Sequence, residues 1–125
     1  MIITVPMVPT SPNTSKLQHY MAKYRLRKAW QEGIFYGVSC SRHRRQLIEQ
    51  AKTGAPMLVE IAVHHSKVFD DDNLAAALKP VLDGLKKLGY IFDDSPAHLR
   101  LALPVKQVQS RERKTVIKIQ PAETG

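Results

Sequence analysis

Two pairs of aspartates, about twenty residues apart, are the side chains in this sequence best suited to chemistry. Asp70 and Asp72 are separated by one residue, and Asp93 is followed directly by Asp94. Carboxylates that lie close together repel one another, and a hard divalent cation such as Mg²⁺, which prefers carboxylate and water oxygens, relieves that repulsion. If the two pairs converge, they form an open Mg²⁺ site that can activate water and stabilise the leaving oxygen in phosphodiester cleavage.

The acids also have a purely structural interpretation. Asp71 or Asp72 is a favourable N-cap for a following helix, and an Asp-x-Asp pair before a helix usually has that role. An EF-hand calcium loop is excluded, because Leu74 replaces a ligand and Ala75 stands where glycine is needed. With Cys40 as the only cysteine, the chain forms neither an internal disulfide nor a cysteine-based zinc site.

A helix over residues 72–88 is expected to carry the acids and one lysine. Its apolar residues recur at spacings of three and four, and Gly89 follows as a terminator. Lys79 shares a polar stripe of this helix with Asp72 and Asp83, on the side away from the leucines. It either reaches a scissile or neighbouring phosphate or forms a solvated i, i+4 pair with Asp83, worth a few tenths of a kcal/mol.

The charge distribution indicates a polyanionic partner. Nineteen Lys and Arg against eleven Asp and Glu give a net charge of +8, and six of the eleven acids lie between positions 70 and 94. A basic protein with one concentrated acidic spot has the layout of a metal-dependent nuclease. The alternative is a basic binding protein whose acids only cap a helix. The candidate contacts to the DNA backbone are Arg42, Arg44, Arg45, Arg100, Lys106 and Arg113; the first three could equally form a solvated helix face.

The surrounding pattern predicts an α+β fold, a two-layer sandwich with helices on one face of a mixed β-sheet. Strands are expected at 2–5, from 57 to 64 and on toward Phe69, at 99–105, and at 115–119, the last joined to its predecessor by a hairpin at 110–114. Helices are expected from Lys16, with Gly33 and Gly37 interrupting, and over 41–52. Tyr24 and Trp30 are expected in the core.

The chain is expected to be one domain over residues 1–125, with 121–125 as a loose tail. Its 43% apolar content is that of a globular protein. It contains no apolar run of 18 residues and no secretory signal at its start, so the sequence predicts a cytoplasmic protein without a membrane segment.

Three segments resemble the RusA family of Holliday-junction resolvases. They are Phe-Asp-x-Asp-Asn-Leu at 69–74, Lys79-x-x-x-Asp83-Gly-Leu85, and Gly-Tyr-Ile-Phe-Asp-Asp at 89–94. The resemblance is close over about 26 residues. It extends more weakly to the opening strand, to Pro-Thr-Ser-Pro-Asn at 9–13 and to the last two strands.

The resemblance implies a homodimeric, Mg²⁺-dependent endodeoxyribonuclease that resolves four-way DNA junctions in recombination and repair. It places the catalytic and metal-binding carboxylates on Asp70, Asp72 and Asp94, with Asp93 in a supporting role. The family's essential lysine falls at Ala76; Lys79 follows three residues later and keeps the family's spacing to Asp83. A DNA-junction-binding protein without catalysis and a nuclease acting on flaps or replication forks remain the alternatives.

Overall fold

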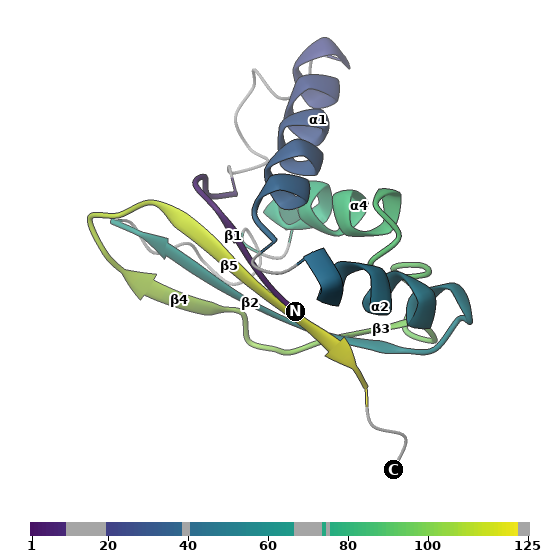
Figure 1. Cartoon of the computed structure of the whole chain (residues 1–125). Helices are drawn as coiled ribbons and strands as arrows, with labels where there is room; N and C mark the ends of the chain where they lie inside the picture. Colours follow the sequence, from purple (N-terminus) through teal and green to yellow (C-terminus); the bar gives the residue numbers. More distant parts are fainter. Residues whose placement is uncertain (10–19, 39–40, 67–73, 75, 123–125) are drawn as a thin grey trace.

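In the computed structural model, residues 1–9, 20–38, 41–66, 74 and 76–122 are described. They form two layers, with helices packed on one face of a mixed sheet, as the sequence predicted (Figure 1). The helices are α1 (Tyr20–Tyr36), α2 (Ser41–Lys52) and α4 (Lys79–Lys87). The strands are β1 (Ile2–Val5), β2 (Met57–His65), β3 (Leu99–Leu101), β4 (Lys106–Gln109) and β5 (Lys114–Pro121).

β2 is the central strand of the sheet. It pairs with β5, antiparallel, from Met57 to His64, and on its other edge with β3 and then β4, both parallel. β1 continues the sheet beyond β5, giving the order β1-β5-β2-β3 with β4 also beside β2. The pairing of β2 with β5 is the longest in the sheet.

The hydrophobic core lies between the sheet and the helices. Residues of β2 alternate between buried and more exposed positions, as expected for a strand with one face in the core. Opposite them, buried side chains from the helices complete the core. The residues with almost no exposed surface include Ile3, Val5, Trp30, Ile34, Met57, Val59, Val63, Leu78, Val81, Leu85, Ile117 and Ile119.

The end of α1 lies directly against β1. The backbone N–H of Thr4 donates to the carbonyl of Gly37 at 3.1 Å, and Ile3 forms a bridge with Val38. A Cβ on Gly37 would collide with the carbonyl oxygen of Thr4 and lie 2.9 Å from that of Gly33. Glycine is therefore required at position 37 for this close approach. The interruption expected at Gly33 does not occur, because α1 continues through Gly33 to Tyr36.

The expected final hairpin is wrong. β4 and β5 do not pair with each other; they flank β2 on opposite edges, so the chain between them crosses the end of β2. The backbone N–H of Ser110 donates to the carbonyl of His65 at 2.9 Å at this crossing. The short distance along the sequence favoured a hairpin between the last two strands. In the structure each of them pairs with a different edge of β2 instead.

Of the strand expected at 99–105, only Leu99–Leu101 is strand (β3), and β4 follows just beyond that range. Pro104 has no backbone N–H to donate to a sheet, so regular pairing stops after Leu101 and resumes at Lys106. The expected tail also begins later than the sequence indicated. Pro121 is the last residue of β5, and the N–H of Ala122 donates to Pro56 at 2.9 Å.

Candidate functional site

α4 is the element around which the predicted site residues are arranged in sequence. Its described helical span begins at Lys79, shorter than the expected 72–88, although Leu74 is helical and buried. Val81 and Leu85 anchor the helix in the core. Gly89, with φ +83°, ends it, because few residues other than glycine adopt that conformation. Lys79 is exposed, on the side away from these anchors, as its helical spacing predicted.

The segment after α4 is fixed at its start and exposed at its acids. Tyr90 and Ile91 are each 1% exposed, and the N–H of Tyr90 donates to the carbonyl of Leu85 at 2.9 Å. This anchoring fixes the point at which the chain leaves α4. Asp93 and Asp94 follow within three and four residues, at a surface position set by the buried pair.

Asp93 forms an ion pair with Lys86 in the last turn of α4. The Lys86 ammonium lies 2.9 Å from an oxygen of Asp93, and both side chains are partly exposed. The hydrogen bond from Lys86, helped by the N–H of Asp94 and by Ser95, lowers the pKa of Asp93 to about 2. The same hydrogen bond and charge raise the pKa of Lys86. Asp93 is therefore ionised at neutral pH, and its carboxylate is already paired with the Lys86 ammonium.

Asp94 is exposed, and within the described part of the chain its carboxylate has no ion pair. Asp70 and Asp72 lie outside the described residues, as does the expected extension of β2 toward Phe69; β2 ends at His65, and Ser66 forms a bend. Among the residues that are described, no three His, Cys, Asp or Glu side chains come together as a metal-binding group.

The predicted DNA contacts lie on two different faces of the molecule. Arg42 and Arg45 are exposed on α2, on the helical side. Arg100 and Lys106 pair with Leu58 and Ala62 of β2, so they project from the sheet face opposite the helices. Arg113 is exposed just before β5. The structure therefore does not gather the six predicted cations into one patch.

Arg44 differs from its neighbours because its guanidinium is held by the protein. Its Nη2 donates to the carbonyl of Phe35 at the end of α1, and its Cζ lies 4.3 Å from the centre of the Phe35 ring. Burial raises the pKa of Tyr90, and Arg44 beside it acts in the opposite direction. Arg44 thus connects α2 to the end of α1.

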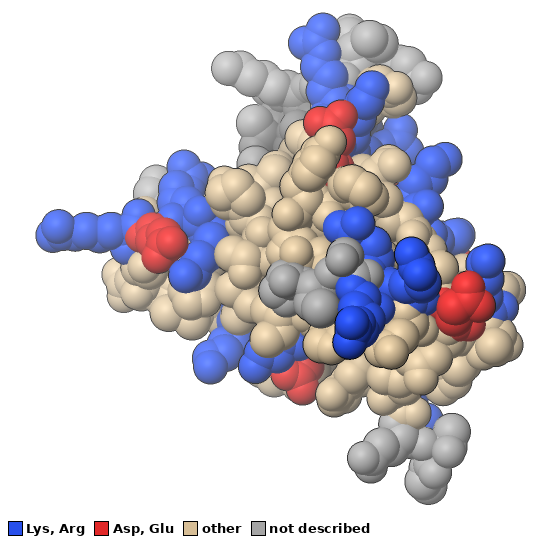
Figure 2. Space-filling view, viewed as in Figure 1, with Lys and Arg blue, Asp and Glu red and all other residues tan. Residues whose placement is uncertain are grey.

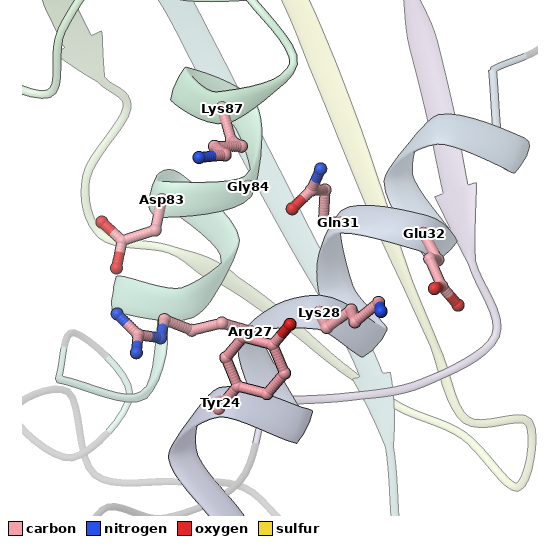
Figure 3. A pocket seen from close by; sticks show the side chains of 8 residues that line it. All are labelled: Tyr24, Arg27, Lys28, Gln31, Glu32, Asp83, Gly84 and Lys87. Carbon is pink, nitrogen blue, oxygen red and sulfur yellow. The ribbon is translucent and has the colours of Figure 1, made fainter. Parts of the chain in front are cut away.

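Sequence reasoning missed a group of polar residues between α1 and α4. Arg27 and Lys28 of α1 and Asp83 and Lys87 of α4 line a groove of about 550 Å³, together with Tyr24 (Figure 3). Tyr24, expected in the core, is 47% exposed here, whereas Trp30 is fully buried as expected. The signal in the sequence was the excess of cations on both helices, but nothing local indicated that these two helices pack together.

The positive charge is spread widely over the surface. Figure 2 shows Lys and Arg over the helical side and at the end where β4 leads into β5, with acids in a few isolated places. No helix in the described ranges is both long and apolar enough to cross a membrane. No protein-family model matches this chain, and no curated protein matches it.

Proposed function

We propose that the protein is a Mg²⁺-dependent endodeoxyribonuclease that acts on branched DNA, with the four-way junction as its substrate in recombination and repair. The observation that carries the proposal is that two acidic segments, 70–72 and 93–94, flank α4 in the sequence of a chain of net charge +8. Acids in such a protein oppose its attraction for phosphates unless a cation lies between them. A homodimer in the cytoplasm is part of the same proposal.

The donor set fits magnesium. Asp70, Asp72 and Asp94 would hold the cation through carboxylate oxygens, the ligands that Mg²⁺ prefers. Asp94 is exposed and forms no ion pair within the described residues, in contrast to Asp93. Bound there, Mg²⁺ supplies charge stabilisation and water activation for phosphodiester hydrolysis.

The remaining residues have supporting parts in this scheme. Lys86 keeps Asp93 ionised next to Asp94, so a negative charge is maintained beside the candidate ligand down to acidic pH. Lys79 is exposed at the start of α4 and offers an ammonium to a phosphate oxygen. Its position supports the interpretation that it replaces the lysine that the resemblance places at Ala76.

The test is cleavage of a labelled synthetic four-way junction in Mg²⁺ and in EDTA, with linear duplex and a flap as parallel substrates. We expect paired Mg²⁺-dependent nicks in the junction. Asp70→Asn and Asp94→Asn should reduce cleavage at least about 100-fold while preserving or strengthening junction binding, because each removes a negative charge facing phosphates. Glu60→Gln, which neutralises an exposed carboxylate in the middle of β2, is the matched control and should cut normally.

Each other result has a definite meaning. Normal cleavage by Asp70→Asn shows that the assigned site is wrong. Tight junction binding by the unaltered protein without any cleavage identifies a binding protein whose acids only cap the helix. Cleavage of the flap with the junction left intact keeps the metal-dependent chemistry and replaces the substrate.

A further inference from the structure

The α1–α4 groove is a surface feature that the proposed catalytic site does not use. It is defined by Tyr24, Arg27 and Lys28 from α1 and by Asp83 and Lys87 from α4. Figure 3 shows Arg27 extending from α1 toward α4, near Asp83, with Lys87 one turn further along α4. Glu32 is the second acid of the lining, and Figure 3 shows its carboxylate on the same side of α1 as the ammonium of Lys28.

Gly84 lies where α4 packs against α1. A Cβ at this position would lie 3.6 Å from the Cα of Gln31 and 3.0 Å from the Cδ1 of Ile34. With no side chain there, α4 lies directly on α1, and the longer side chains on each side of the crossing form the walls of the groove. The groove is therefore a consequence of the packing of α4 on α1.

Both helices present mostly positive charge. Lys and Arg outnumber Asp and Glu by four to one in α1 and by three to one in α4. Arg27, Lys28 and Lys87 are all exposed, and within the described residues none of them forms an ion pair. These three cations outnumber the two acids of the lining, Glu32 and Asp83, so the groove keeps an excess of positive charge that complements a polyanion.

We propose that the α1–α4 groove binds the sugar–phosphate backbone of one DNA strand, with phosphates contacted by Arg27, Lys28 and Lys87. From Tyr24 to Gln31 the groove follows α1 for about 10 Å, which at 3.4 Å per nucleotide corresponds to about three nucleotides. Tyr24, exposed at one end, offers a ring to a sugar or base. The choice of DNA as the ligand rests on the proposed function. A strand held here lies along α4, the helix that the two acidic segments flank in sequence.

The first test compares two triple variants that lose the same charge. Arg27→Ala/Lys28→Ala/Lys87→Ala empties the groove of cations, whereas Lys52→Ala/Arg111→Ala/Lys118→Ala removes three exposed cations elsewhere. Binding of a labelled four-way junction is followed by fluorescence anisotropy in EDTA at several NaCl concentrations. We expect the groove variant to bind about tenfold or more weakly, with the slope of log K against log[NaCl] reduced by about 2–3. The control should lose much less of both.

The second test changes Asp83 of the groove, for which we expect affinity for the junction to rise instead of fall. Asp83 opposes phosphate binding, so Asp83→Asn should tighten junction binding several-fold. Glu60→Gln makes the same change in charge on β2 and should leave affinity nearly unchanged. Thermal melting of every variant establishes that it is folded before its affinity is compared.

The groove and the nuclease proposals fail in different ways. Equal losses of affinity in the two triple variants, or no DNA binding by the unaltered protein, contradict the proposal that the groove binds DNA. Junction nicking by the unaltered protein together with normal binding by the groove variant also overturns the groove, while the nuclease stands. A selective loss of binding in the groove variant, with no Mg²⁺-dependent nicking under any condition, keeps the groove and overturns the nuclease.

Discussion

The pairing of Asp93 with Lys86 gives stability a defined dependence on pH. The pKa of Asp93 is lowered from 3.8 to about 2 in the folded protein, so its contribution to stability is present above about pH 4 and is lost as the pH falls toward 2. Asp93→Asn should therefore flatten the fall in melting temperature between pH 4 and pH 2. At pH 7 the change should be small, because both partners are partly exposed and solvent screens the pair.

The measurement is thermal melting by circular dichroism from pH 2 to pH 7. Glu49→Gln is the control, since Glu49 is an exposed carboxylate without an ion pair in the described part of the chain. If Asp93→Asn and the unaltered protein lose stability in parallel below pH 4, the ion pair does not form in solution.

Arg44 should contribute to folding more than to DNA binding. It donates to the Phe35 carbonyl and lies over the Phe35 ring, contacts that Arg45, one residue later, does not make. We expect Arg44→Ala to lower the free energy of unfolding by about 1–2 kcal/mol, and Arg45→Ala by less than about 0.5 kcal/mol. Urea denaturation of both variants checks this. Equal values for the two would contradict the structural role.

The three arginines of α2 show what residue-level prediction misses. From the sequence, Arg42, Arg44 and Arg45 were all predicted as DNA contacts, because composition and helical spacing do not reveal what packs beside a helix. The difference comes from Phe35, which belongs to another helix and reaches Arg44 through the fold. Trp30, by contrast, was correctly predicted as core, since a large apolar side chain in an amphipathic pattern is seldom left in water.

At the scale of elements, the contact of α1 with β1 depends on Gly37. A Cβ there would meet two backbone oxygens, which have no freedom to move aside. Gly37→Ala should therefore lower the free energy of unfolding by about 1–3 kcal/mol. Gly84→Ala is the control: its Cβ would meet the end of the Ile34 side chain at 3.0 Å, and alanine favours the helix. Chemical denaturation distinguishes them, and a larger loss for Gly84→Ala would contradict this account.

Elements with a strong local signal were predicted well, and those defined by distant pairing were not. The alternation in β2, the opening strand and the helix at 41–52 follow from local patterns, and the structure confirms them. The chain crosses the end of β2 because β4 and β5 pair with its two opposite edges, and no local sequence pattern indicates such a pairing. Gly33 lies within α1, and its missing side chain leaves room for Val5, whose Cγ1 would be 2.7 Å from a Cβ there.

For the whole molecule, the candidate site was only partly accessible from the sequence. The acidic segments were recognisable because their members lie close together along the chain. The α1–α4 groove was not, because Arg27 and Lys87 are sixty residues apart and meet only through helix packing. Positive charge on both the helical side and the opposite sheet face also shows that net charge alone does not locate a DNA path.

The proposed junction cleavage requires two sites, and one chain offers a single set of acids, so the active species should be a dimer. A two-fold junction matches a C₂ dimer, with one strand cut by each subunit. Light scattering during size-exclusion chromatography should give twice the 14.1 kDa of one chain. Co-refolding the unaltered protein with excess Asp70→Asn should place most active subunits in mixed dimers. These should leave singly nicked junctions, because the inactive subunit cannot cut its strand. A monomeric mass, with paired nicks in unchanged proportion after co-refolding, would show that each chain acts alone and that dimer symmetry does not couple the two cuts.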